Sequence, residues 1–373
     1  MAAGVAMEIA EIAEIAEIAI VGCGGISHAH ARAARSLGGT VRFAACCDTD
    51  AERARDWAAK YGAERTYASL EALLDAESPQ AVLLATWPNL HRSQIETCLA
   101  AGVRNILCEK ALAVTGAEAS EIHDLARAAG ALVMEAFMYR HHPAIRAIEQ
   151  RIAAGAVGEV DYVRAVFNLW DAELEAPDDD TRNWRQRKET AGGVPFDLAC
   201  YAVNACGHFA AALPVRASAT GSVSERYGTI NRLAGVVEYE NGRIGVIESS
   251  RRSSFSQELL ISGSHGALHL PVAWSLDAVT SVTRIRSPRF AEVEREEIAV
   301  ERANSYALQL DNFAQAAAGH AQPVVPLVQS VVNAYVSEAL NTSLLERRNV
   351  NIELPETIAA DYRTCLPERG TDS

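Results

Sequence analysis

The chain has 373 residues, of which 49% are hydrophobic and 22% charged, a composition that predicts a globular protein of about two domains with no apolar segment long enough to cross a membrane. Its formal net charge of −14 at pH 7, without a cluster of Lys and Arg, argues against binding to nucleic acid. The eight cysteines are irregularly spaced and the ten histidines form no metal-ligand motif, so we expect free thiols in a reducing cytoplasm and no bound metal.

The first predicted element follows a three-residue repeat, EIA, that begins at Glu8. On an α-helix a step of three residues turns about 300°, so the isoleucines would spread around the axis instead of forming one apolar stripe. The last copy, residues 17–21, suits a buried β-strand, which usually has about 4–8 residues. We interpret residues 1–16 as a dispensable low-complexity extension, and their acidic character excludes a signal peptide.

From residue 17 to residue 138, short apolar runs alternate with helical patterns, which predicts a Rossmann-type doubly wound parallel sheet. The first strand leads into a GxGxxS variant of the dinucleotide fingerprint. Gly22 allows a tight turn, and Gly24 lets a pyrophosphate approach the N-terminus of the following helix. The candidate cofactor contacts in this loop are Gly22, Gly24, Gly25, Ile26 and Ser27. A glycine-rich turn without a ligand is the alternative.

The second predicted strand ends in Asp48, about twenty residues beyond Ser27, where an acid can bind both hydroxyls of an adenosine ribose. Its carboxylate would repel a 2′-phosphate, and Thr49 stands where an NADP enzyme often has an arginine. We therefore predict NAD as the cofactor, with NADP as the second choice. The alternative is that Asp48 only caps the next helix.

Several separated motifs then occur in a fixed order. The residues Pro88, Asn89 and His91 precede Glu109 and Lys110, which end another predicted strand. The later motifs are EAFMYRHHP at 135–143, NWR at 183–185 and AGGVPFDLACYAVNACGHF at 191–209. Over about residues 17–350 the chain thus resembles the Gfo/Idh/MocA family of NAD(P)-dependent oxidoreductases. It is most similar to the branch of glucose–fructose oxidoreductase and of dihydrodiol or xylose dehydrogenases.

The resemblance implies that Lys110 is the active-site lysine of an EKP motif and that Asp197 and Tyr201 lie on a DxxxY helix. Hydride transfer to or from a sugar carbon leaves a hydroxyl proton that a side chain must take or give. Tyr201 could be that acid or base if the ammonium of Lys110 lowers its pKa, and Lys110 would polarise the substrate oxygen. Asp197, one helical turn before Tyr201, can orient the substrate or keep Lys110 charged. Ala111 stands where the family usually has proline, so the backbone after Lys110 is less constrained.

The resemblance also implies further contacts, each with a packing or surface role as its alternative. His91 is expected near the nicotinamide edge, unless it is a histidine on a solvated helix terminus. The other expected cofactor contacts are Pro88, Asn89, Glu109, Trp184 and Arg185. His142 is expected at a hinge and pocket wall, where it could contact substrate. Glu173 and Glu175, in the acidic segment 171–180, predict a cationic substrate such as an aminosugar, unless the segment is ordinary acidic surface.

After Pro143 the pattern changes to longer alternating strands, and Asn241–Gly242 predicts a hairpin with a two-residue turn of positive φ. We predict an α+β substrate-binding and oligomerisation domain, residues 139–354, on a largely antiparallel open-faced sheet. We expect the helices of 303–346 to pack against it and the tail, 355–373, to be loosely ordered. One sheet face should carry the helix of Asp197 and Tyr201. The other, as the resemblance implies, would contact a second subunit in a homodimer or homotetramer.

Together these features predict a cytoplasmic NAD-dependent oxidoreductase. It would transfer hydride between nicotinamide and a ring hydroxyl or ketone of a sugar, a cyclitol or an aminosugar, including an aminoglycoside-type pseudosugar. One alternative is a non-catalytic nicotinamide-sensing regulatory protein, against which the presence of both Lys110 and Tyr201 speaks. Another is a dihydrodiol-type dehydrogenase with a flat aromatic substrate.

Overall fold

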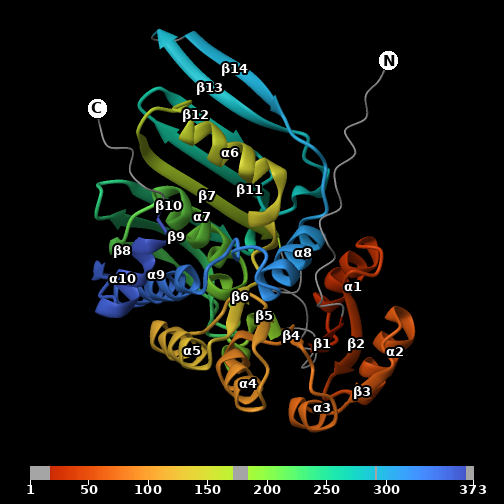
Figure 1. Ribbon diagram of the computed structural model, residues 1–373. Coiled ribbons are helices and arrows are strands. Elements are labelled where there is room, and N and C mark those ends of the chain that lie inside the picture. Colours follow the sequence, from red (N-terminus) through yellow and green to blue (C-terminus); the bar gives the residue numbers. More distant parts are fainter. Residues whose placement is uncertain (1–16, 171–183, 290–291, 367–373) are drawn as a thin grey trace, which may run out of the picture.

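The computed structural model describes residues 17–170, 184–289 and 292–366, and these form two sheets with helices between and around them (Figure 1). The first sheet, within the described residues, has six parallel strands in the order β3-β2-β1-β4-β5-β6. Its strands are β1 (Glu17–Val21), β2 (Arg42–Cys47), β3 (Arg65–Tyr67), β4 (Ala81–Leu84), β5 (Asn105–Cys108) and β6 (Leu132–Glu135). Its helices are α1 (Ser27–Ser36), α2 (Ala51–Tyr61), α3 (Leu70–Ala76), α4 (Pro88–Ala100) and α5 (Gly116–Ala129). The predicted doubly wound parallel sheet is confirmed.

The strand β1 begins at Glu17, the residue that the repeat predicted. Only Glu17 of this strand is exposed, while the other four residues are buried between the neighbouring strands β2 and β4. Strand order reverses at β1 and β4, and open α/β sheets bind their ligands beyond the carboxyl ends of the strands at such a point. Residues 1–16, which contain the other copies of the repeat, lie outside the described residues.

The second sheet has nine strands, counted over the same described ranges, in the order β14-β13-β12-β11-β7-β10-β9-β8-β15. β7 and β10 pair in parallel, and the other named pairs are antiparallel. The strands are β7 (Val160–Trp170), β8 (Pro214–Val223), β9 (Ile230–Tyr239), β10 (Ile244–Ser250), β11 (Arg252–Gly263), β12 (Gly266–Leu270), β13 (Ser281–Arg289), β14 (Glu292–Ala299) and β15 (Val350–Asn351). This is the largely antiparallel second sheet that the sequence predicted.

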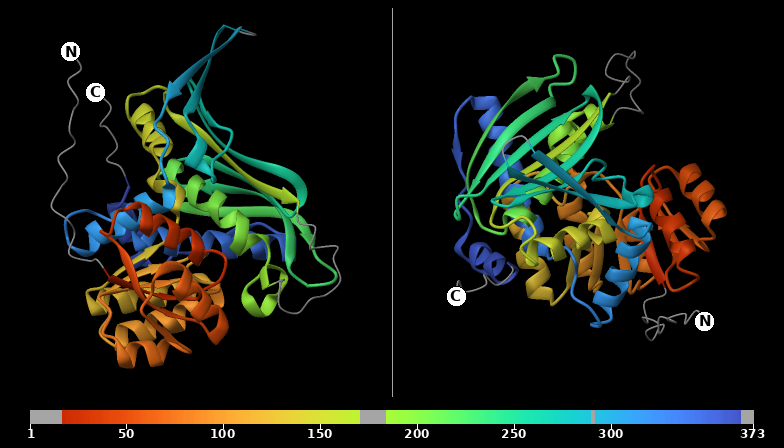
Figure 2. Two further views of the ribbon diagram at one scale, coloured as in Figure 1. Left: turned by 90° about the vertical axis from the view of Figure 1, so that its right-hand side faces the viewer. Right: turned by 90° about the horizontal axis from the view of Figure 1, so that it is seen from above.

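Helices cover the face of the second sheet that is turned toward the parallel sheet (Figure 2). The longer helices after β6 are α6 (Pro143–Ala153), α7 (Cys200–Ala210), α8 (Ser305–Ala317), α9 (Leu327–Glu346) and α10 (Glu356–Thr364), of which α6, α7 and α9 contact the second sheet. The short turns are η1 (Met138–His141), η3 (Trp184–Gln186), η4 (Lys188–Thr190), η5 (Pro195–Ala199) and η6 (Leu276–Ala278). α7 contacts β7 and β10, as expected for the helix that carries Tyr201. On the opposite face β7 exposes Tyr162 and Trp170, because alternate residues of a strand point to opposite sides.

The predicted hairpin joins β9 to β10, but its turn differs from the prediction. Tyr239 N donates to Arg243 O at 3.1 Å and Gly242 N donates to Tyr239 O at 2.9 Å, which makes a three-residue loop. Gly242 has a φ of 83°, whereas Asn241 is not among the residues with positive φ. The two-residue turn was therefore wrong, because one left-handed glycine is enough to close a three-residue loop.

Two expectations for the C-terminal part hold only in part: α9 packs against the second domain, as expected, but α8 does not. α8 contacts α1 and η1, so it packs against the parallel-sheet domain, and α9 lies between α5 on one side and α7 and β8 on the other. The chain after Leu354 forms α10, whose Ile358 and Tyr362 are buried, so the first part of the predicted tail is a packed helix. Within the described ranges, no helix is both long enough and apolar enough to cross a membrane.

Candidate active site

The glycine loop lies between β1 and α1, at the carboxyl edge of the parallel sheet. Gly22 has a φ of 93°, and a Cβ there would lie 2.5 Å from Ala85 O, so only glycine fits. A Cβ on Gly24 or Gly25 would meet no described atom within 4 Å, and no described side chain caps α1. The loop therefore offers open space at an uncapped helix N-terminus, which suits the pyrophosphate of a dinucleotide.

Asp48 follows β2 and is almost fully buried. Its Oδ2 accepts from Cys23 N at 2.9 Å, its Oδ1 accepts from Asp50 N at 2.9 Å, and Arg53 Nη1 lies 3.2 Å from Oδ1. Asp50 caps α2, because its carboxylate accepts from the amides of Glu52 and Arg53 at 3.1 Å. The alternative of Asp48 as the helix cap is therefore wrong. Sequence reasoning looked for an arginine only next to Asp48 and missed Arg53, which one helical turn brings back to it.

The three predicted catalytic residues meet between the two sheets. Lys110 Nζ donates to Asp197 O at 2.7 Å and to Asp197 Oδ1 at 3.0 Å. The same ammonium lies 5.0 Å from the centroid of the Tyr201 ring. Burial lowers the pKa of Lys110. A lysine from the end of β5 and an acid and a tyrosine from η5 and α7 thus form one cluster.

Asp197 is the centre of the charges in this cluster. It lies in one turn of π-helix, η5, directly before α7. Besides Lys110, Arg251 Nη2 donates to its Oδ2, and Arg185 Nε lies 3.6 Å from its Oδ1. Arg251 is buried, and sequence reasoning missed it because a pair of arginines after a strand is ordinarily a surface feature. One carboxylate thus holds three cations from separate parts of the chain.

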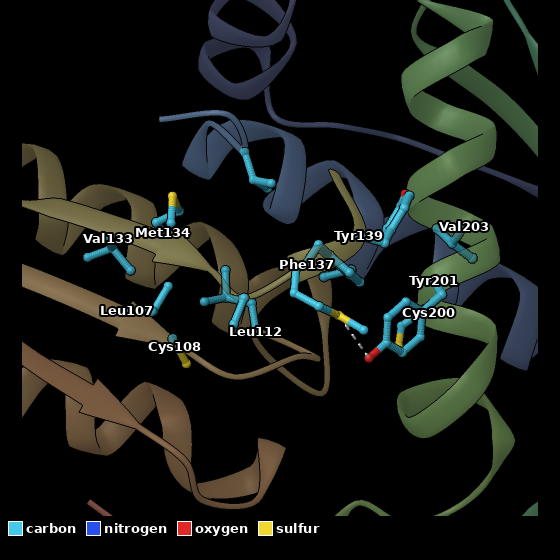
Figure 3. Close-up of a cluster of buried hydrophobic side chains, with 14 of the residues drawn as sticks. Leu107, Cys108, Leu112, Val133, Met134, Phe137, Tyr139, Cys200, Tyr201 and Val203 are labelled. Atoms are coloured by element: carbon cyan, nitrogen blue, oxygen red, sulfur yellow. Dashed lines mark hydrogen bonds between the residues drawn. The ribbon is translucent and has the colours of Figure 1, made fainter. Parts of the chain in front are cut away.

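Tyr201 projects from α7 into a group of aromatic rings (Figure 3). Its ring centroid lies 5.6 Å from that of Phe137, 5.5 Å from Phe167 and 5.7 Å from Trp274. Its hydroxyl donates only a weak hydrogen bond, of 3.9 Å, to Met138 Sδ. Burial raises the pKa of Tyr201 well above its ordinary value, so the expected lowering by Lys110 was wrong: the ammonium faces the ring and not the hydroxyl.

His91 and Glu109 hold the backbone around Lys110. His91 is fully buried on α4, and its Nδ1 donates to Ala111 O at 2.9 Å, so the alternative of a solvated histidine is wrong. Burial lowers the pKa of His91. Glu109 Oε2 accepts from Lys110 N at 3.2 Å, and its Oε1 lies 2.7 Å from Nε2 of His30. His30, on the first turn of α1, was missed because its partner is 79 residues away.

A second contact between the domains lies beside this cluster. Trp184 stacks on Trp87, with ring centroids 6.1 Å apart, and the Arg185 guanidinium carbon lies 4.5 Å from the centroid of the Trp184 ring. Asn89 Nδ2 donates to Glu189 O at 2.9 Å. Pro88 begins α4 directly after Trp87. The segment that contains Trp184 and Arg185 is thereby joined both to α4 and to Asp197.

Of the three predicted substrate residues, His142 alone lies in the described part of the chain. His142 is buried and caps α6, its Nδ1 accepting from Ala144 N at 3.1 Å. Glu173 and Glu175 lie outside the described residues. Among the residues that are described, no cluster of His, Cys, Asp and Glu could hold a metal ion, and the eight cysteines, all of them described, are unpaired thiols.

Comparisons with known proteins identify the family and the fold of the chain. Residues 16–137 match the "Oxidoreductase family, NAD-binding Rossmann fold", and residues 145–269 match the "GFO/IDH/MocA C-terminal domain". A D-xylose 1-dehydrogenase (NADP(+)) of Haloferax volcanii is 30% identical over 77% of this chain and 85% of that protein. A trans-1,2-dihydrobenzene-1,2-diol dehydrogenase of Mus musculus is 30% identical over 61% of this chain and 65% of that protein. A levoglucosan dehydrogenase, solved with NADH and levoglucosan, covers 91% of this chain and 99% of its own with a TM-score of 0.79 at 18% identity, which shows the fold.

Proposed function

Because this chain belongs to the Gfo/Idh/MocA family of oxidoreductases, we propose that it transfers hydride between a nicotinamide cofactor and a ring hydroxyl or ketone of a sugar-like substrate. The observation that carries this proposal is the meeting of Lys110, Asp197 and Tyr201 at the carboxyl edge of the parallel sheet. The glycine loop that suits a pyrophosphate ends at the same edge. A protein that only senses the cofactor would not need a buried lysine with a lowered pKa beside it.

When bound, the cofactor supplies or accepts the hydride at its nicotinamide ring. The chain has to move the hydroxyl proton of the substrate, and Lys110 is the group that can do this. Its lowered pKa makes loss of the ammonium proton easier in oxidation, and the ammonium can return the proton in reduction. Tyr201 stays protonated because its pKa is raised, and its hydroxyl would exchange the weak bond to Met138 Sδ for one donated to the substrate oxygen. Asp197 orients Lys110 through the two hydrogen bonds that it accepts.

We propose NAD as the preferred cofactor. The Asp48 carboxylate stands at the end of β2, where the adenosine ribose would lie, and repels a 2′-phosphate. Arg53 reduces this repulsion, because its guanidinium pairs with Asp48. Discrimination against NADP then rests on one carboxylate that is partly neutralised, which fits a family whose members use either cofactor.

The substrate we propose is a neutral sugar, a cyclitol or an aminosugar. The names of the relatives support a sugar-like substrate, since they include a xylose and a levoglucosan dehydrogenase. The acidic segment 171–180 favours an amino group on the substrate. A second candidate is a dihydrodiol-type substrate, because the partly exposed indole of Trp87, stacked on Trp184, offers a flat aromatic surface beside Arg185.

We also propose that the protein works in the cytoplasm as a homodimer or homotetramer. The face of the second sheet that exposes Tyr162 and Trp170 is the surface we expect a second copy to cover. Light scattering coupled to size exclusion checks this proposal. Trp170→Glu should shift the mass toward that of one chain, and a monomeric parent protein would refute it.

Reduction of NAD and of NADP by the purified protein, measured with a panel of sugars, aminosugars, cyclitols and a dihydrodiol, tests the proposed function. We expect turnover with at least one member of the panel and none for Lys110→Met with the same member. Turnover of the dihydrodiol alone would select the second candidate. Tight cofactor binding without turnover of any member would favour a sensing role.

A further inference from the structure

The backbone that carries Lys110 is held by three buried ionisable side chains. Glu109 Oε2 accepts from Lys110 N at 3.2 Å, His91 Nδ1 donates to Ala111 O at 2.9 Å, and Glu135 Oε1 accepts from Leu112 N at 2.8 Å. At most 5% of the surface of each of these three residues is exposed. Three successive residues, 110–112, are thus each tied to a group that can change its charge.

This arrangement compensates for a feature of the sequence. Ala111 has no ring to restrict its backbone, whereas proline at this position would fix φ. The direction of the Lys110 side chain therefore depends on the hydrogen bonds made by its neighbours. Those from His91 and Glu135 come from different elements, α4 and β6, and they bind the carbonyl and the N–H of the one peptide group that joins Ala111 to Leu112.

Glu135 differs from the other two because part of its carboxyl group has no partner. It ends β6 opposite Cys108 of β5, and within the described residues its Oε2 makes no hydrogen bond. Desolvation raises the pKa of Glu135 to about 7; the nearby Ser330 hydroxyl and the hydrogen bond from Leu112 N oppose this increase, the Glu109 charge adds to it, and the Lys110 charge reduces it slightly. The titratable and polar groups that face it from the surrounding elements are Glu109, Lys110, Cys108, Cys200 on α7 and Ser330 on α9.

We propose that Glu135 is a positioning residue whose carboxyl group fixes the 110–112 segment and whose charge state is coupled to that of Lys110. With Glu135 protonated, Asp197 and Glu109 are the nearby anions, and the ammonium of Lys110 gives up its proton more readily. Ionisation of Glu135 adds a buried negative charge and stabilises the ammonium. The catalytic meaning of this coupling rests on the proposed function, but the coupling itself can be measured without a substrate.

The chain contains only three lysines, Lys60, Lys110 and Lys188, so each can be followed by name. Reductive ¹³C-methylation gives one dimethyl-lysine signal for each, and Lys110→Arg identifies the signal of Lys110. We expect the chemical shift of the Lys110 signal in the parent protein to change in two steps as the pH rises. The lower step, near pH 7, reports the ionisation of Glu135, and the other reports the ionisation of Lys110 itself. Glu135→Gln keeps an acceptor for Leu112 N and should remove the lower step alone.

The matched control is Glu118→Gln. Glu118 Oε2 accepts from Val114 N at 3.0 Å, the same kind of bond to the same loop, but its carboxylate is only partly buried. This variant should retain both steps. A single step in the parent protein, or a lower step that persists in Glu135→Gln, overturns the proposal.

Two further measurements keep the test decisive. If Glu135→Gln does not fold, infrared spectroscopy of the parent protein takes its place. The carbonyl band of a protonated carboxylic acid should disappear over the same pH range as the lower step. A spectrum without such a pH-dependent band overturns the proposal. With an active substrate, Glu135→Gln should change the pH profile of kcat while the KM for the cofactor stays the same; a purely structural role would lower kcat equally at every pH. Normal coupling without activity would refute the proposed function alone.

Discussion

The candidate cofactor site has two ends, one at Asp48 and one at Lys110, and the charged residues of these two ends are held by different kinds of contact. At the Asp48 end the charged partner Arg53 is only five positions away in the chain and more than half of its side chain is exposed, while the one distant bond comes from a backbone amide, that of Cys23. At the Lys110 end the bonds from Lys110 and Arg251 to Asp197 join residues 87 and 54 positions apart, and all three are buried or nearly so. We therefore expect changes at the Asp48 end to alter selectivity modestly, and changes at the Lys110 end to affect stability and rate strongly.

The largest effect is expected for Arg251→Met, which removes a buried partner of Asp197. Removing one partner of a buried ion pair is strongly destabilising, and although Asp197 keeps its contacts with Lys110 and Arg185, the free energy of unfolding should fall by about 3 kcal/mol. Urea denaturation followed by circular dichroism measures this loss. Arg216→Met is the control, because its pair with Glu238 is exposed and should contribute less than about 1 kcal/mol. Equal losses in the two variants would contradict the comparison.

Lys110→Met is expected to lower kcat by roughly a hundredfold or more, the usual scale for a general acid or base. This corresponds to about 2.7 kcal/mol of transition-state stabilisation. Steady-state kinetics with a substrate from the panel measures kcat, and quenching of tryptophan fluorescence checks that the cofactor still binds. Lys188→Met, at an exposed lysine, should leave kcat unchanged. A rate near that of the parent protein would remove Lys110 from the mechanism.

The raised pKa of Glu135 makes stability depend on pH. Between its ordinary pKa, about 4.3, and about 7 the folded protein binds one more proton than the unfolded chain, so the free energy of unfolding falls as pH rises, by up to about 1.4 kcal/mol per pH unit. Burial lowers the pKa of His141 to about 3. Between that value and its ordinary pKa of about 6.5, this histidine therefore makes the free energy of unfolding rise with pH, the opposite of the effect of Glu135. The prediction therefore concerns the difference between Glu135→Gln and the parent protein. That difference should grow from pH 5 to pH 7, and parallel stability curves would contradict it.

The same contrast explains what the sequence could predict. Alternating apolar runs identify the parallel strands and the start of β1, because a strand buried on both sides shows itself in its own residues. The residues Lys110, Asp197 and Tyr201 were recognised together because their motifs follow one another in the order typical of the Gfo/Idh/MocA family. The partners Arg251, His30 and Glu135 could not be found in this way, since the residues they contact are distant in sequence. The raised pKa of Tyr201 follows from its burial against Phe137, Phe167 and Trp274, which are distant from it in sequence and which no local pattern reveals.

At the Asp48 end we expect a smaller effect, on the choice of cofactor. Asp48→Ser removes the carboxylate that repels a 2′-phosphate and frees Arg53 to pair with it, so the ratio of kcat/KM for NADP to that for NAD should rise about tenfold. Dissociation constants from fluorescence quenching provide a readout that does not depend on turnover. The double change Asp48→Ser with Arg53→Ser should cancel most of the gain. A parent protein that already prefers NADP would show that Asp48 does not select the cofactor.

The smallest effect is expected for removal of the residues before Glu14. A chain that begins at Glu14 keeps all of β1 and should match the parent protein in melting temperature and turnover. A chain that begins at Ala19 lacks Ile18, which is fully buried and pairs with strands on both sides, so its free energy of unfolding should fall by about 2–5 kcal/mol. Differential scanning calorimetry compares the two chains. If the chain beginning at Glu14 also melts early, the repeat before β1 contributes to the fold, and the boundary drawn from its three-residue period is wrong.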